Sequence, residues 1–95
     1  MPSMSLICEH HVSFDVCTNS GYLLAAFTHM QQEGGSLREA LEVGGFSLVK
    51  HESSIMSPIR ASLTFDGQAA VLGDNGEMHY TDGTGWYECL IAPPG

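Results

Sequence analysis

The stretch IRASLTFDGQAAVLGDNGEMHYTDGTGWYECLIA, which occupies residues 59–92, decides the fold. Short apolar runs alternate in it with the turn dipeptides Asp66-Gly67, Asn75-Gly76 and Asp82-Gly83. Asn-Gly and Asp-Gly readily take the positive φ angles that tight hairpin turns require. The runs between them therefore predict an antiparallel meander, with strands over Ile59–Phe65, Gln68–Leu72, Glu77–Thr81 and Trp86–Ala92.

The residues before this meander predict two further strands. Apolar and polar residues alternate over Ser5–Cys17, which is typical of a strand with one buried face. Phe46–His51 is the second candidate. Turn residues follow the first strand at Thr18–Gly21, and Pro58 predicts a loop over Ser53–Pro58, because proline lacks the backbone donor that a strand interior needs.

Two helices are predicted between those strands. Over Tyr22–Glu33, apolar residues recur at the spacing of one helix face, with Ser20 as the N-cap and Gly34-Gly35 as the stop. Ser36 and Glu39 then form a capping box, which predicts a short helix over Leu37–Val43. The chain is thus expected to be one small acidic globular domain, residues 1–95, of the α+β class: two short helices packed on an antiparallel β-meander of about five to six short strands.

The charge balance excludes several kinds of partner. The chain has 3 Lys+Arg against 11 Asp+Glu, a formal net charge of −8. Its cations, Arg38, Lys50 and Arg60, all lie in the middle of the sequence. Direct binding to nucleic acid or to an anionic membrane needs clustered cations, so neither is expected.

The cysteines and the N-terminus bear on the compartment. Cys8, Cys17 and Cys89 are an odd number, and no Cys-x-x-Cys pair is present. The chain starts without the cationic region of a secretory signal, so a cytoplasmic location is predicted. A single disulfide bond between Cys8 and Cys17 is left as an alternative.

No convergent set of catalytic groups emerges from the sequence, so no enzymatic activity and no cofactor are predicted. Cys89 and His79 are able to face each other on adjacent strands, but a free cysteine is more often inert in a core. Cys8, His10 and Cys17 lie close together in sequence, and the strand pattern puts Cys8 and His10 on one face. Their spacing matches no standard zinc pattern, and a metal-binding or thiol-dependent protein is therefore only an alternative.

The last third of the chain favours a binding surface, because it contains acids and aromatics but no Lys or Arg. The predicted partner is a basic protein, held by charge complementarity and aromatic anchors. By analogy of size and charge only, such a protein would be an immunity protein, a phage-type inhibitor such as an anti-CRISPR protein, or a chaperone. The candidate partner-binding residues are Asp66, Asp74, Glu77, Tyr80, Asp82, Trp86, Tyr87 and Glu88.

Two other interpretations of the same features remain. The acidic composition serves equally well to keep a small domain soluble. A meander with exposed edges also suits a structural or accessory domain that self-associates, for example as a homodimer. The five histidines would gain charge near pH 6, which would weaken association with a basic partner in acid, although scattered surface histidines are the more common case.

Overall fold

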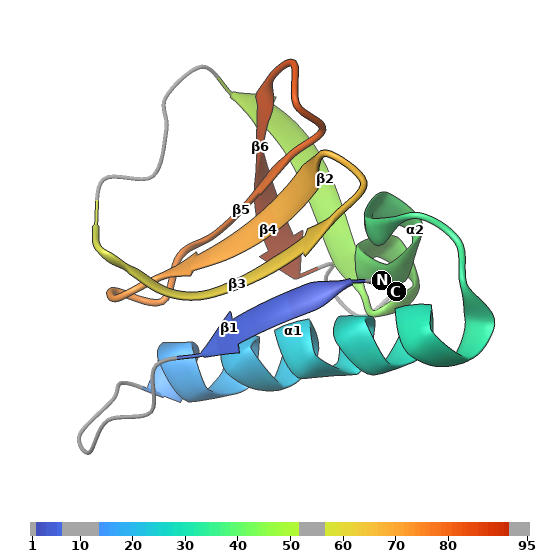
Figure 1. Ribbon diagram of the computed structural model, residues 1–95. Coiled ribbons are helices and arrows are strands. Elements are labelled where there is room, and N and C mark those ends of the chain that lie inside the picture. The colour runs from blue at the N-terminus through green and yellow to red at the C-terminus, as the bar shows by residue number, and fades with distance from the viewer. Residues whose placement is uncertain (1, 7–13, 52–56, 92–95) are drawn as a thin grey trace.

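The computed structural model describes residues 2–6, 14–51 and 57–91 (Figure 1). Within these ranges the chain forms two helices and six strands, an α+β arrangement that confirms the predicted class. In chain order the elements are β1 (Ser3–Leu6), α1 (Phe14–Glu33), α2 (Leu37–Val43), β2 (Phe46–His51), β3 (Ile59–Phe65), β4 (Gln68–Gly73), β5 (Met78–Thr81) and β6 (Trp86–Ile91).

The described strands form a single antiparallel sheet in the order β1-β3-β4-β5-β6-β2. Strands β3 to β6 are the predicted meander, with Asp66 at a φ of 51° and Gly67 at 78° in the first turn. The predicted bounds of the strands Phe46–His51 and Ile59–Phe65 are confirmed at both ends. Strand β2 pairs with β6 and β1 pairs with β3, so the two earliest strands form the two edges of the sheet.

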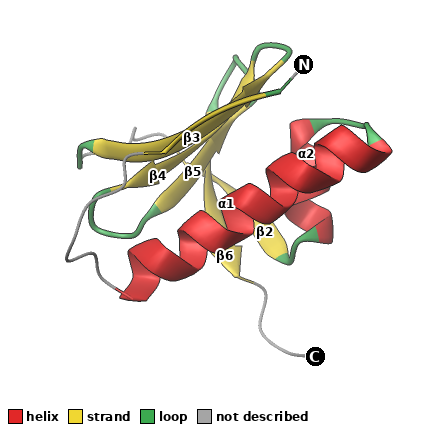
Figure 2. Cartoon of the chain, turned by 60° about the horizontal axis from the view of Figure 1, so that its bottom comes forward, coloured by secondary structure: helices red, strands yellow, loops and turns green. Residues whose placement is uncertain are grey.

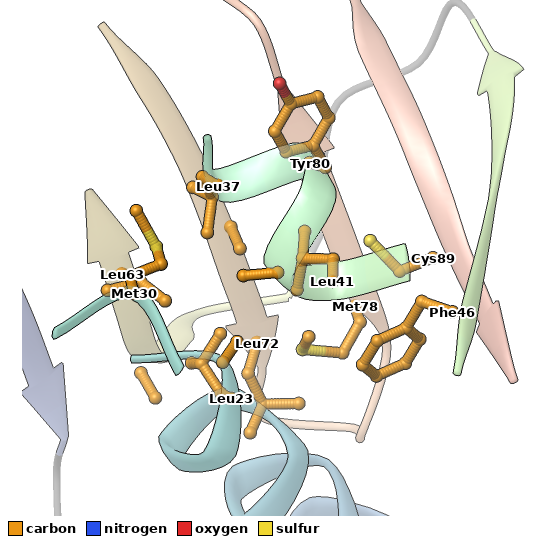
Figure 3. Packing of buried hydrophobic residues seen from close by; sticks show 14 residues of the cluster. Leu23, Met30, Leu37, Leu41, Phe46, Leu63, Leu72, Met78, Tyr80 and Cys89 are labelled. Atoms are coloured by element: carbon orange, nitrogen blue, oxygen red, sulfur yellow. The ribbon is translucent and has the colours of Figure 1, made fainter. Parts of the chain in front are cut away.

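Both helices pack on the same face of the sheet (Figure 2). Figure 3 shows side chains of α1 and α2 meeting those of the strands in one apolar core. The strand residues that point into it alternate along each strand, as period-2 patterning requires. The buried cluster contains Leu23, Ala26, Met30, Leu37, Ala40, Leu41, Phe46, Ala61, Leu63, Ala70, Leu72, Met78, Tyr80 and Cys89.

The predicted N-cap forms at the start of α2. The hydroxyl of Ser36 accepts a hydrogen bond of 3.1 Å from the backbone N–H of Glu39. The side chain of Gln68 on β4 accepts a further one, of 3.4 Å, from the N–H of Arg38. These bonds satisfy donors that a helix start otherwise leaves to water, and the second also links α2 to the sheet.

The N-terminal prediction is wrong in two respects. Helix α1 begins at Phe14, so Phe14–Cys17 are helical rather than part of a strand, and Thr18–Gly21 are not a turn. Ser20 therefore lies inside the helix and does not cap it. The strand in this region is β1, whose Met4 packs against the core, while residues 7–13 lie outside the described residues. Residues with weak helix propensity cost only about 0.5 kcal/mol each, so packing of one face of α1 outweighs them.

Candidate functional site

The face of the sheet opposite the helices carries the candidate site. Strand register places its side chains in rows, since paired residues point to the same side. One row runs Val71, His79, Glu88 and Val49 across β4, β5, β6 and β2. The neighbouring row ends in Thr81, Trp86 and His51. We call this side of the sheet the outer face.

An exposed patch lies on β2 and β6 at one margin of the outer face. We call it the β2–β6 patch and define it by its six outward positions: Ser47, Val49, His51, Trp86, Glu88 and Leu90. Val49 is 49% exposed and Leu90 is 45% exposed, while Glu88 is also exposed. Aliphatic groups, the indole of the chain's one tryptophan and a carboxylate thus occupy neighbouring positions.

The cations of the described chain do not occupy outward positions of this patch. Arg38, on α2, has its guanidinium 5.1 Å from the centre of the Tyr87 ring and 3.7 Å from Glu42. Arg60, on β3, is largely buried and pairs with Asp74. Lys50 lies opposite Tyr87 in the register, on the other side of the sheet from Glu88. Among the outward positions of β2, β4, β5 and β6, the formal charge at neutral pH is therefore negative.

A chain of hydrogen bonds lies beside the patch. Nε2 of His51 is 3.0 Å from Nδ1 of His79, and Nε2 of His79 is 3.2 Å from Oε2 of Glu77. Ser57 donates a hydrogen bond of 2.6 Å to Oε1 of Glu77. His79 is almost fully buried, although it lies on the outer face. The contact between the histidines crosses β6, because β6 separates β2 from β5.

The charge of Glu77 determines which nitrogens carry hydrogen. The hydrogen bond from Ser57, followed by the contacts with His79, lowers the pKa of Glu77 against an opposing effect of burial. A carboxylate only accepts, so Nε2 of His79 must donate to it. In the neutral ring, Nδ1 of His79 is then a lone pair that accepts from Nε2–H of His51. Such a chain can hold and relay protons.

The structure divides the eight residues predicted to bind a partner. Asp66 and Asp82 lie in two turns at one end of the sheet. These turns are adjacent, since a Cβ on Gly83 would come within 3.2 Å of the carbonyl oxygen of Gly67. Tyr87 contacts Asp82 at this end, at 3.4 Å. The turn that contains Asp74 and Glu77 lies at the opposite end. Trp86 and Glu88 belong to the β2–β6 patch.

Tyr80 does not contribute to any described surface. Its side chain is 2% exposed and lies in the core, where its hydroxyl donates to Gln68 over 3.0 Å. Its alternation with Thr81 places it on the inner side of β5. Burial raises the pKa of Tyr80, as expected for a phenol surrounded by apolar groups. Tyr80 is thus a core residue and not a surface anchor.

Asp82 organises the turn that precedes β6. Its carboxylate accepts hydrogen bonds from the hydroxyl and N–H of Thr84, at 2.7 and 2.9 Å, and from the N–H of Gly85, at 3.1 Å. The bonds from Thr84, and then the one from Gly85, lower the pKa of Asp82 to about 2. This carboxylate is therefore charged throughout the physiological range and adds a fixed negative charge near Trp86.

The proposed pairing of Cys89 with His79 is wrong. His79 lies opposite Glu88, so Cys89 points to the inner face while His79 points to the outer one. Burial raises the pKa of the Cys89 thiol to about 12, which is typical of an inert core cysteine. Among the described residues no group of three or more potential ligands could hold a metal ion. Cys8 and His10 lie outside those residues, and Cys17 is part of α1.

Sequence reasoning missed several residues of the outer face: Ser47, Val49, His51, Ser57 and Leu90. The alternation in Phe46–His51 does place Val49 and His51 on the side opposite Phe46. The missing information is that β2 pairs with β6, which brings that side next to Trp86 and Glu88.

Comparison with family models, curated proteins and solved structures finds no significant match. No helix within the described part of the chain is long and apolar enough to cross a membrane. The surface itself is therefore the basis for assigning a function.

Proposed function

We propose that this protein binds a basic segment of a partner protein through the β2–β6 patch and thereby caps that partner. The observation that carries the proposal is the composition of the patch, where Trp86, Val49 and Leu90 surround the carboxylate of Glu88 and no Lys or Arg is present. A partner segment with a cation flanked by apolar groups would complement it. Tryptophan is among the residues that most often dominate binding energy.

The acids near the patch extend this surface. An interface of standard size covers about 800 Å² on each partner, which is roughly one-seventh of the 5653 Å² surface of this protein. Six side chains are too few for that, so the contact would continue over the turns that contain Asp82 and Asp66. Their charges would mainly accelerate association and orient a basic partner, since exposed charges steer encounter more than they hold a complex together.

The same features discriminate between binding and mere solubility. Charge that only maintains solubility has no need of exposed aliphatic groups and a half-buried indole beside it. Self-association remains the alternative, because β2 is an edge strand. Lys50 on this strand and the net charge of −8 both oppose pairing of two copies.

The test uses substitutions that separate the patch from the overall charge. Proteins captured from a lysate of the source organism would be identified, and the affinity of the purified partner measured for Trp86→Ala, Glu88→Gln and Glu33→Gln. Glu33 is exposed at the end of α1, so its variant changes the net charge equally but leaves the patch intact.

We expect Trp86→Ala to weaken binding by about tenfold or more and Glu88→Gln by several-fold, with Glu33→Gln close to wild type. Equal affinities for all three variants would contradict the proposal. If the partner binds all three variants equally and dissociates at high salt, binding depends only on the net charge of the protein.

A further inference from the structure

The geometry of the contact between His51 and His79 limits how many protons the two rings can bind while their hydrogen bond is kept. An N–H···N bond between two imidazoles needs one hydrogen and one lone pair between the rings. At 3.0 Å the two facing nitrogens, Nε2 of His51 and Nδ1 of His79, are in direct hydrogen-bond contact. Two neutral rings satisfy this requirement, with His51 as the donor.

A first added proton is compatible with the contact. It converts His79 to an imidazolium, which donates through Nε2 to Glu77 and through Nδ1 to His51. His51 then accepts at Nε2 and carries its own hydrogen on Nδ1. The pair thus holds one extra proton if His51 exchanges its tautomer.

A second added proton is not compatible with the contact. Both facing nitrogens would then carry hydrogen, and two cationic rings would face each other N–H to N–H. His79 is held by Glu77 and is 6% exposed, whereas His51 is the last residue of the edge strand β2 and is only partly buried. The contact between the two rings therefore breaks when both are protonated.

The charged groups around the pair set the direction of this response. Glu77 contacts His79 directly, and Glu88 on β6 is its cross-strand neighbour, so two carboxylates lie beside the pair. Arg60 on β3 carries the opposite charge, but Arg60 is paired with Asp74 of the next turn. The remaining outward neighbours on the adjacent described strands are uncharged: Val49, Ser62, Val71, Thr81 and Trp86.

We infer that the His51–His79 contact is a proton-operated switch that releases the basic partner from the β2–β6 patch in acid, a regulation that rests on the proposed binding function. His51 is a member of the patch and the direct cross-strand partner of Trp86. A proton on His51 would offset the negative charge that Glu88 gives to the patch. Loss of the contact would also alter the surroundings of Trp86, because His51 is its cross-strand neighbour.

The first measurement needs no partner. The imidazole nitrogens of the complete chain would be followed by ¹⁵N NMR from pH 8 to pH 5, with Trp86 fluorescence as a second signal from the only tryptophan. We expect two protonation steps separated by about one pH unit or more, as for interacting sites, and a change of tautomer at His51 in the first step. Independent titration of the two rings would overturn the inference.

Substitutions show which histidine each protonation step belongs to. His51→Gln should leave a single titration at His79, while His29→Gln, a control on α1, should leave both coupled steps unchanged. If His51→Gln does not alter the titration of His79, the coupling is contradicted. If a variant folds poorly, the NMR titration of the wild-type protein still tests the coupling of the two histidines.

The second measurement adds a synthetic peptide of alternating lysine and leucine residues. Binding should weaken by about tenfold or more between pH 7.5 and pH 5.5 in wild type, since each proton bound on release contributes up to tenfold per pH unit. The same loss is expected for His29→Gln, and a much smaller one for the double variant His51→Gln, His79→Gln.

The two proposals fail in different ways. Coupled titration without peptide binding at either pH would reject the binding function and the release, and leave only a coupled pair of histidines. Binding that is equally strong at both pH values would retain the binding function and overturn the switch.

Discussion

The side-chain amide of Asn19 donates a hydrogen bond of 2.7 Å to the backbone carbonyl of Gly76, which joins the early turns of α1 to the turn between β4 and β5. The two residues are 57 positions apart in sequence. This bond anchors the part of the helix that has the weakest helix propensity.

Replacing this amide by a carboxylate tests the anchor. Asn19→Asp keeps the size of the side chain but places an acceptor against the Gly76 carbonyl, so we expect a loss of about 1–3 kcal/mol in the free energy of unfolding at pH 7. Urea denaturation measures it. Gln31→Glu makes the same chemical change at an exposed position of α1 and should cost less than about 0.5 kcal/mol. Equal effects of both variants would contradict the role of Asn19.

The core beneath the sheet should be sensitive to cavities. Leu72 is 0% exposed on β4, so Leu72→Ala should lower the free energy of unfolding by about 2–5 kcal/mol. Val43 is 70% exposed at the end of α2, and Val43→Ala should change it by less than about 0.5 kcal/mol. The inner-face assignment of β4 would be refuted by a Leu72→Ala variant as stable as Val43→Ala in thermal or urea unfolding.

Helix α2 should depend on its N-cap. Ser36→Ala removes the acceptor for the N–H of Glu39 and should destabilise the protein by about 1 kcal/mol. Ser47→Ala serves as the control, because it makes the same substitution at an exposed serine of β2 that does not cap a helix. Urea denaturation of both variants provides the comparison, and identical midpoints would show that the cap is not needed to hold α2.

The turn at Asp82 should loosen only in strong acid. The pKa of Asp82 is about 2 in the folded protein and near the ordinary value of 3.8 when unfolded, so the carboxylate stabilises the fold above the unfolded pKa. This contribution falls as the pH drops from about 4 towards 2. The amide signals of Thr84 and Gly85 should therefore shift with a midpoint near pH 2 by NMR, and Asp82→Ala should abolish the shift. A midpoint near pH 4 would argue against these hydrogen bonds.

Cys89 should react only when the chain unfolds. Its thiol is buried and has a pKa of about 12, so very little thiolate is present at neutral pH. In a variant with Cys8→Ser and Cys17→Ser, labelling by a thiol reagent at pH 8 should be at least about a hundredfold slower in the folded than in the urea-unfolded protein. Similar rates in both states would restore a thiol-dependent function as a candidate.

The sequence predicts the meander well because its signals are local. Asp66 takes a φ of 51° and Gly67 one of 78°, which is the turn chemistry that their side chains favour. The N-cap at Ser36 is equally local. Helix α1 could not be bounded in this way, because the bond between Asn19 in its early turns and Gly76 joins residues far apart in sequence.

The candidate site depends on contacts that are distant in sequence. Trp86 and Glu88 could be selected from composition, but their neighbours His51 and Val49 come from a strand some 40 residues earlier, according to the register. The His51–His79 contact needs β2, β6 and β5 to lie in that order. Composition also cannot separate Tyr80 in the core from Tyr87, whose ring lies beneath Arg38.

The most direct test of the central claim is to map the bound surface by NMR. Backbone amide signals of the complete protein would be recorded at pH 7.5 with increasing amounts of the lysine-leucine peptide or of an identified basic partner. We expect the largest shifts to fall on Val49, Trp86, Glu88 and Leu90. Shifts confined to the exposed side of α1, around Leu24 and Thr28, would contradict the claim that the outer face of the sheet binds the partner.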